Sequence, residues 1–220
     1  MPARCVLALP GTTVVAHGRP VGLLEPQQQH GARQEAADVR RLRGGAGRVA
    51  ELGFQAEAMR LIRAALPAEK GLLGFVGGPL TLFFYAVAGS HKGDLADAAK
   101  GLDDGRYEGF CAQLMDLLAA NIVLQLRSGA DTVAVMDTAA GEIPLEAFRR
   151  HVVPRLGQLF EAVRREVPGA LFTYYSRQTG PEHWASLAGL PISCLGVDWL
   201  HPISQVLAAV GDRWAVQGNF

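Results

Sequence analysis

The chain has 220 residues, of which 49% are hydrophobic, so it can bury one sizeable core. Its 21 basic and 21 acidic residues cancel, which leaves no net field to attract nucleic acid or an anionic membrane. No apolar run approaches ~20 residues without a charge or a turn signal, so we expect no membrane span.

The cysteines and the amino terminus bear on compartment and cofactors. Three scattered cysteines suit a reducing compartment better than a disulfide framework, and they are Cys5, Cys111 and Cys194. No CxxC, HExxH or similar spacing predicts a metal site. The amino terminus is too broken by Pro10 and Gly11 to be a signal peptide. We therefore expect a soluble, cytoplasmic protein without a metal site.

Residues 1–48 are expected to form a separate, partly irregular segment. Two β-branched clusters, Cys5–Leu9 and Thr12–Ala16, flank a Pro-Gly pair, and this pattern predicts a hairpin. The basic stretch Arg40–Arg48 is rich in glycine and alanine and is interpreted as a solvated linker rather than a phosphate-binding run. From Val49 onward, apolar residues recur at helical spacing until Pro67 ends the pattern.

The next segment, 71–91, reads GLLGFVGGPLTLFFYAVAGSH. Its first part, Gly71–Val76, is bounded by glycines and is too short for a helix, so it predicts a buried strand. After Gly77-Gly78, Pro79 suits the first position of a helix that is apolar almost all round. Loops of this kind, at the carboxyl ends of parallel strands, are where α/β proteins place their functional sites.

The remainder of the chain alternates between helices and strands. Helices are expected at 94–100, 106–128, 142–148, 151–167, 182–188 and 203–210, and strands at 131–136, 170–175, 192–197 and 214–217. Such alternation implies right-handed crossovers and a parallel sheet. The strands lack strict polar alternation, which is typical of sheets covered on both faces. Composition alone leaves an open doubly wound sheet and a barrel both possible.

Three blocks, in order, resemble the motifs of one family. They are GFVGGPLTLFFYAVAGSH, GADTVAVMDTAAG and GVDWLHPISQVLAAVGDRWAVQGNF. Each is similar to a motif of the uroporphyrinogen decarboxylases, and with matching helices between them the resemblance covers residues 49–220. The resemblance implies an α/β fold, a (β/α)8 TIM barrel that is incomplete here. Its strands three to seven would begin at Gly71, Thr132, Ala170, Ile192 and Trp214.

The same resemblance implies an activity and a set of site residues. These enzymes remove CO2 from the four acetate side chains of uroporphyrinogen III without a cofactor, giving coproporphyrinogen III, and they are often homodimers. Tyr85 matches the tyrosine that lies against the tetrapyrrole, and Thr138 matches the Ser/Thr that hydrogen-bonds the substrate. Phe75, Gly77 and Gly78 would wall the cleft. For Asp137 and Asp198, a cap of the following loop is as good an interpretation as a site role.

The sequence also departs from the family pattern. The family's catalytic aspartate, its RQAGRY-like arginines and its site histidine have no counterpart here. One hypothesis is a fragment that is weak or inactive alone; another is a diverged protein in which the two N-terminal clusters replace missing strands. Two other functions stay open. A zinc-dependent corrinoid or thiol methyltransferase shares the barrel, but the relevant strand ends in Tyr174-Tyr175-Ser176, without His-x-Cys, and Cys194 lies inside a strand. The other is a non-catalytic porphyrin-binding remnant.

Overall fold

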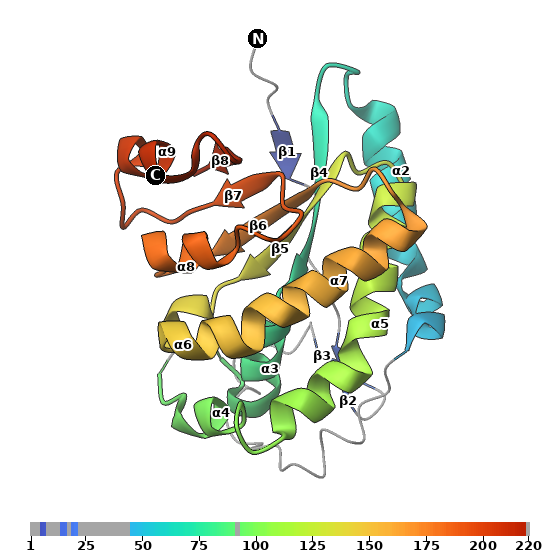
Figure 1. The fold of residues 1–220 in the computed structure, drawn as a ribbon. Coiled ribbons are helices and arrows are strands. Elements are labelled where there is room, and N and C mark those ends of the chain that lie inside the picture. The colour runs from blue at the N-terminus through green and yellow to red at the C-terminus, as the bar shows by residue number, and fades with distance from the viewer. Residues whose placement is uncertain (1–4, 8–13, 17–18, 22–44, 91–92, 219–220) are drawn as a thin grey trace.

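The computed structural model describes residues 5–7, 14–16, 19–21, 45–90 and 93–218. Within them, one sheet has six parallel strands in the order β1-β4-β5-β6-β7-β8. Their bounds are β1 Cys5–Leu7, β4 Gly71–Gly77, β5 Thr132–Asp137, β6 Phe172–Ser176, β7 Cys194–Gly196 and β8 Ala215–Gln217. The strands fan from an upright β4 to a nearly horizontal β7 (Figure 1), as the twist between neighbouring strands requires. The predicted α/β fold with a partial barrel-like sheet is confirmed.

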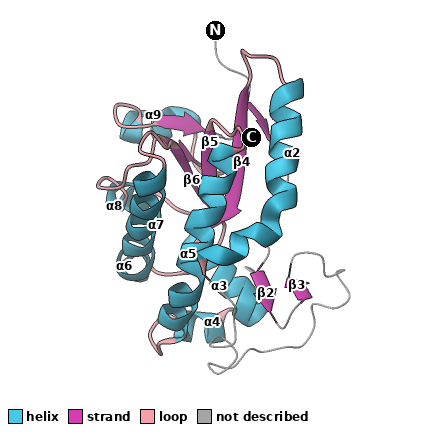
Figure 2. Ribbon diagram, turned by 90° about the vertical axis from the view of Figure 1, so that its right-hand side faces the viewer, coloured by secondary structure: helices cyan, strands magenta, loops and turns pink. Residues whose placement is uncertain are grey.

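The helices follow the strands in the predicted alternation. The longer ones are α2 Gly53–Ala65, α3 Pro79–Ala88, α5 Arg106–Arg127, α7 Val153–Glu166 and α9 Ile203–Val210. Short helices are η2 Ala46–Leu52, α4 Ala96–Lys100, η3 Ala140–Glu142, α6 Leu145–Ala147, η4 Phe148–Val152 and α8 Pro181–Ser186. Helices α5 and α7 pack against each other over one face of the sheet (Figures 1 and 2). The opposite face of the strands is therefore left to line a cavity.

The predicted N-terminal hairpin is wrong. Cys5–Leu7 instead pairs in parallel with β4, with Cys5 opposite Gly71. The second cluster supplies β2, Val14–Ala16, which pairs antiparallel with β3, Arg19–Val21. A turn signal acts locally, whereas the edge of β4 offers unpaired backbone groups from a distant part of the chain. Residues 40–44 of the basic stretch and residues 91–92 lie outside the described residues.

The two helices predicted between β5 and β6 form one continuous helical stretch, in which α6, η4 and α7 follow one another without a gap. Pro144 follows η3 and is the residue before α6, which is only three residues long. The turn η4 is a π-helix that leads directly into α7, and Pro154 lies in the first turn of α7. Proline lacks the N–H that an α-helix needs at interior positions, so a change of helical type before Pro154 avoids a lost hydrogen bond.

An aromatic cluster fixes α3 and α5 against each other. The ring of Phe83 meets those of Tyr107 and Phe110 edge-on, at centroid distances of 5.3 and 5.5 Å. All three side chains are buried. Edge-to-face contacts of this kind add to the free energy gained from burial alone. The cluster therefore holds α3, which follows the Gly-Gly-Pro loop, in a fixed position beneath the sheet.

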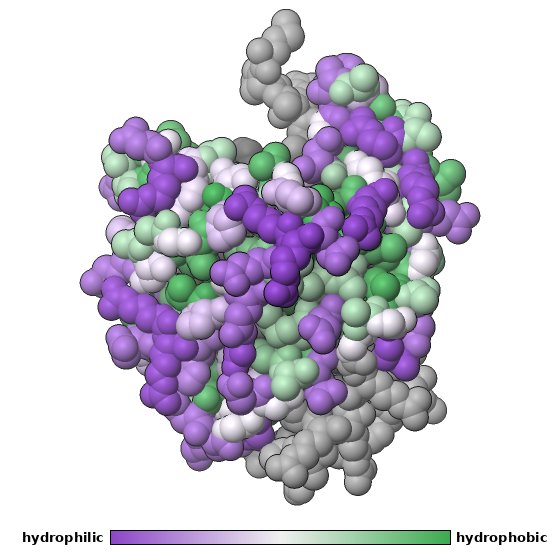
Figure 3. Space-filling model, turned by 45° about the vertical axis from the view of Figure 1, so that its right-hand side comes forward, coloured by the Kyte–Doolittle hydropathy of each residue, from purple (hydrophilic) through white to green (hydrophobic). Residues whose placement is uncertain are grey.

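Among the described residues, α5 alone has the length and apolar composition of a membrane-spanning helix. However, 56% of its most apolar window is buried inside the fold. On the face shown in Figure 3, hydrophilic side chains lie over and among the hydrophobic ones. These features are typical of a core helix in a globular domain.

Candidate functional site

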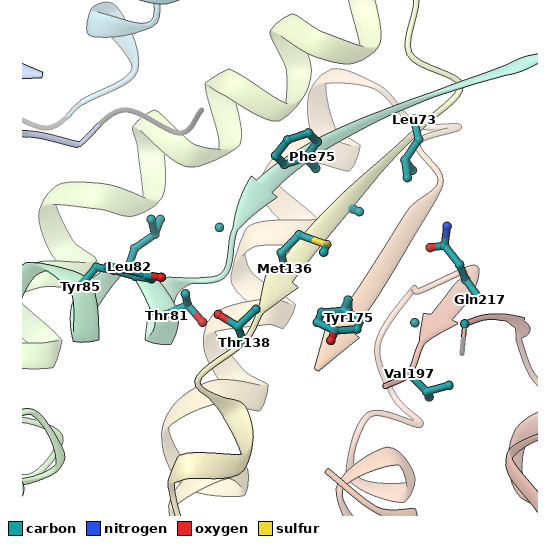
Figure 4. Close-up of a pocket in the computed structure, with 14 residues that line it drawn as sticks. Leu73, Phe75, Thr81, Leu82, Tyr85, Met136, Thr138, Tyr175, Val197 and Gln217 are labelled. Carbon is teal, nitrogen blue, oxygen red and sulfur yellow. The ribbon is translucent and has the colours of Figure 1, made fainter. Parts of the chain in front are cut away.

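A half-open cavity of about 500 Å³ lies on the side of the sheet away from α5 and α7. Alternate residues of β4 and β5 face it, because successive side chains of a strand point to opposite sides. The residues between them belong to the core under the helices. Its lining is Leu73, Phe75, Gly77, Thr81, Leu82, Tyr85, Ala134, Met136, Thr138, Tyr175, Gly196, Val197, Gln217 and Gly218 (Figure 4). The cavity is therefore apolar at its base, with hydroxyl groups toward the carboxyl ends of the strands.

The loop Gly77-Gly78-Pro79 sets the direction of α3 and so places Tyr85. The N–H of Gly78 donates to the carbonyl of Met136 at 2.8 Å, which ties the loop to β5. Pro79 begins the helix, and Gly89 ends it in the left-handed region with φ 68°. Most of α3 is buried in the core, but Tyr85 is 41% exposed and faces the cavity.

Asp137 is the buried polar centre under this loop. Its Oδ1 accepts from the Thr81 hydroxyl at 2.7 Å and from the Thr81 N–H at 3.2 Å, and its Oδ2 accepts from the Tyr174 hydroxyl at 3.1 Å. Burial raises the pKa of Asp137 above its ordinary value, and these hydrogen bonds offset only part of that rise. Because Asp137 does not line the cavity, its place is structural: it joins β5, β6 and α3.

Two tyrosines and two threonines bring hydroxyl groups to the cavity. Thr81 and Thr138 lie near each other at the end of β5, and Tyr175 stands on β6 (Figure 4). Burial raises the pKa of Tyr85 and of Tyr175 above the ordinary value, and the positive charge of Arg177 lowers both in part. Both phenols are therefore neutral near pH 7 and can donate hydrogen bonds to an anionic group.

Four of the five residues expected to contact a ligand line this cavity: Phe75, Gly77, Tyr85 and Thr138. The fifth, Gly78, does not. A Cβ at Gly78 would lie 2.7 Å from the Asp137 carboxyl carbon, so this glycine permits close packing under the loop. Asp198 accepts hydrogen bonds from the N–H groups of Gln178 at 2.6 Å and Leu200 at 3.0 Å. These bonds favour a loop-capping role for Asp198 over a site role.

Two residues that the sequence did not single out also shape the site. Gln125 of α5 accepts from the Phe75 N–H at 2.9 Å and donates to the Phe75 carbonyl at 3.1 Å. Its amide thus satisfies the β4 backbone beyond the three residues that β1 pairs. The second is Arg177, which directly follows β6. A lone glutamine on an amphipathic helix and an arginine in a loop carry no sequence signal of these roles.

The donor set does not form a metal site among the described residues. No three His, Cys, Asp or Glu side chains in that part of the chain gather closely enough to hold an ion. Cys111 is buried and Cys194 lies in β7, and neither lines the cavity. Zinc in catalytic sites needs three such ligands and an open position.

The fold and the cavity together define a class of protein, a parallel α/β protein with a barrel-like sheet and a cavity toward the carboxyl ends of its strands. Residues 16–220 match the family model "Uroporphyrinogen decarboxylase (URO-D)". The chain therefore belongs to the uroporphyrinogen decarboxylase family. The family match begins at residue 16, whereas the motifs in the sequence predict that the family-like portion starts at residue 49. The division into 1–48 and 49–220 therefore stays a prediction.

Individual relatives agree with this placement. The chain is 32% identical over 178 residues to the uroporphyrinogen decarboxylase of Saccharophagus degradans, covering 77% of this chain and 49% of that protein. It is 31% identical over 166 residues to that of Brucella anthropi, covering 74% and 48%. The chain thus spans about half the length of these curated relatives. In structure it is similar to a methyltransferase from Methanosarcina mazei, with a TM-score of 0.59, 18% identity and coverage of 91% of this chain and 56% of that one. That likeness shows the fold alone.

Proposed function

We propose that this chain supplies a tetrapyrrole-binding site for uroporphyrinogen decarboxylation. The reaction removes CO2 from the four acetate side chains of uroporphyrinogen III to give coproporphyrinogen III, a step in haem biosynthesis. The observation that carries the proposal is the cavity itself, apolar at its base and edged by hydroxyl groups. The largely apolar macrocycle of four pyrroles joined by methylene bridges would pack against Phe75, Met136 and Tyr175, and its polar substituents would meet Tyr85 and Thr138.

The reaction needs no cofactor because a pyrrole ring is electron-rich. Protonation of the ring carbon next to the one that carries the acetate gives a cationic ring, and the acetate-bearing carbon is conjugated with the cation and accepts electrons. The bond between the acetate methylene and its carboxylate then breaks, CO2 leaves, and the electron pair passes into the ring. A second proton at the methylene carbon leaves a methyl group, and loss of the ring proton restores the pyrrole. A protein assists by supplying protons and by stabilising the cation.

Tyr85 and Thr138 suit binding better than proton transfer. The raised pKa of Tyr85 keeps its phenol neutral, so it donates a hydrogen bond to a carboxylate without losing its proton. The cavity lining within the described residues contains no Asp, Glu, His, Lys or Arg. The best general acids have a pKa near the working pH, and the raised pKa values of Tyr85 and Tyr175 make these phenols weak ones. The chain by itself is therefore proposed to bind the tetrapyrrole and to decarboxylate it weakly or not at all.

Binding and turnover are measured separately to test this. Uroporphyrin III binding is followed by fluorescence, and anaerobic incubation with uroporphyrinogen III is followed by chromatography of the oxidised products. Thr138→Val is expected to weaken binding about tenfold, the effect of one lost hydrogen bond to a charged group. Thr132→Val, at the other end of the same strand, is the matched control and should bind as the wild type does. Equal binding by the two variants would remove Thr138 from the site.

A non-catalytic porphyrin-binding remnant is the second candidate. The absence of Asp, Glu and His from the described cavity lining favours it. The two candidates differ in products. If the chain binds uroporphyrin but forms no heptacarboxylate or later product, the remnant is correct. If stepwise products accumulate, the decarboxylase is correct. If a metal assay finds one stoichiometric zinc ion, both give way to the methyltransferase alternative.

The remaining proposals concern the setting of the protein. We propose a cytoplasmic protein that forms homodimers and binds no nucleic acid. Its balanced charges support the last point, because nucleic-acid binding depends on a cationic surface. Light scattering coupled to gel filtration gives the mass of the assembly, and a monomeric mass at all concentrations would contradict the homodimer.

A further inference from the structure

Arg177 directly follows the end of β6, close in the fold to residues that line the cavity. The last register pair between β5 and β6 is Asp137 with Ser176, so the residues that follow them, Thr138 and Arg177, leave the sheet at the same level. Tyr175 and Thr138 both line the cavity. Arg177 is the first residue after β6, two positions along the chain from Tyr175.

The guanidinium of Arg177 is held in this position by two neighbours. Its Nη2 lies 3.3 Å from Oε1 of Glu142 and 2.9 Å from Oε1 of Gln178. Glu142 belongs to η3, which follows β5, so the ion pair spans the ends of two adjacent strands. The Arg177 side chain is only 16% exposed, and its charge acts on the phenols of both Tyr85 and Tyr175.

The backbone of this turn is also fixed. Gln178, with φ 56°, is the one non-glycine residue with positive φ among the described residues. Its N–H donates to Asp198 at 2.6 Å, and the Arg177 carbonyl accepts from the N–H of Gly141 at 3.0 Å. A Cβ at Gly141 would lie 2.6 Å from that carbonyl oxygen. A left-handed non-glycine residue carries backbone strain and persists where its surroundings hold it, often at ligand sites.

We propose that Arg177 binds a carboxylate of the ligand at the mouth of the cavity. This rests on the proposed function, in which the ligand is an apolar ring with carboxylates around its edge. The ring would occupy the apolar base of the cavity. The carboxylates on its outer edge would then project toward the strand ends, where the Arg177 guanidinium lies. A guanidinium presents five N–H donors in a planar fork and can hold Glu142 and a second carboxylate together. The family motif places carboxylate-binding arginines near the N-terminus, and this sequence lacks that motif. Arg177 would supply a cation in their place.

The test compares Arg177→Gln, Arg177→Lys and a control, Arg150→Gln. Arg150 pairs with Asp103 on an exposed surface, so its loss removes the same charge away from the cavity. The ligands are uroporphyrin, with eight carboxylates, and mesoporphyrin, with two. Arg177→Gln is expected to weaken uroporphyrin binding about tenfold to a hundredfold, and mesoporphyrin binding less. Arg177→Lys should restore part of the affinity, and the difference between variants should shrink in high salt.

Each outcome decides a separate point. Equal uroporphyrin affinity in the wild type and in folded Arg177→Gln overturns the role of Arg177 and leaves the proposed function standing. If the wild type binds neither porphyrin, the proposed function fails, and benzene-1,3,5-tricarboxylate becomes the probe. Binding of that anion by the wild type and its loss in Arg177→Gln supports the carboxylate site, whereas absent or unchanged binding overturns it. Circular dichroism and the melting temperature establish that each variant is folded.

Discussion

The hydroxyl of Thr81 donates a 2.7 Å hydrogen bond to Oδ1 of Asp137, and this bond fastens the start of α3 to the end of β5. The same hydroxyl accepts from the N–H of Ala139 at 3.0 Å, so it also orders the turn that carries Thr138. A buried carboxylate outside the cavity therefore positions the groups that line it. Buried polar networks of this kind specify one arrangement only when every member is paired.

Replacing Asp137 with asparagine is expected to change how stability depends on pH. Burial raises the pKa of Asp137 above its ordinary value of 3.8. A carboxyl group whose pKa rises on folding favours the folded state in acid, and that contribution is lost as the pH increases through the folded-state pKa. Relative to Asp137→Asn, the wild type should therefore be most stable in acid and lose its advantage toward neutral pH. Urea unfolding at a series of pH values measures this difference, and a difference that grows with pH would contradict it.

Gly78→Ala is expected to destabilise the fold by about 1–3 kcal/mol, the usual effect of overpacking. The new methyl group would meet the carboxyl carbon of Asp137 at 2.7 Å. Gly109→Ala is the matched control. A Cβ at Gly109 meets nothing within 4 Å, and the residue lies in α5, so this variant should gain up to about 1 kcal/mol from helix propensity. Thermal unfolding compares the two, and equal melting temperatures would show that the loop yields without cost.

Ala134→Phe is expected to block the cavity without unfolding the protein. Ala134 lines the cavity on β5, so the added ring would enter about 500 Å³ of open space. Val135, the next residue, faces the core under the helices and is fully buried. Val135→Phe should instead cost about 1–3 kcal/mol through overpacking. Loss of uroporphyrin binding with an unchanged melting temperature in Ala134→Phe is the predicted signature; retained binding would place the ligand elsewhere.

Gln125→Met is expected to lower the free energy of unfolding by about 2 kcal/mol. Methionine keeps the volume of the side chain but leaves the Phe75 N–H and carbonyl without the amide that pairs with them. Gln113→Met, on the exposed side of the same helix, is the control and should change stability by less than about 0.5 kcal/mol. Denaturant unfolding of both variants, with light scattering to follow aggregation, provides the measurement.

The strands and helices that the sequence predicted well have local signals. Gly77-Gly78-Pro79 marks the end of β4 and the start of α3, and Pro67 marks the end of α2. Apolar periodicity over 22 residues identified α5, which begins at Arg106. These signals act within a few residues of one another, so the sequence expresses them directly.

The features that the sequence did not predict depend on contacts between distant residues. The pairing of Cys5 with Gly71 joins the chain terminus to a strand far along it. The Gln125–Phe75 and Arg177–Glu142 contacts join residues 50 and 35 positions apart. For the site, the motifs predicted which residues approach the cavity, but Gly78 turned out to pack against Asp137 instead. A motif identifies a loop, and only the packed structure shows which side of the loop each residue faces.

The amide of Gln125 also has a consequence for how the chain is made. Part of the β4 edge is satisfied by a side chain 50 residues further along, so during synthesis that edge stays open until α5 has been translated and docks. At 5–20 residues per second the delay is roughly 3–10 s. Over that interval the nascent β4 resembles the exposed strand edges that seed aggregation, and it is the point at which a ribosome-bound chaperone would have most to protect.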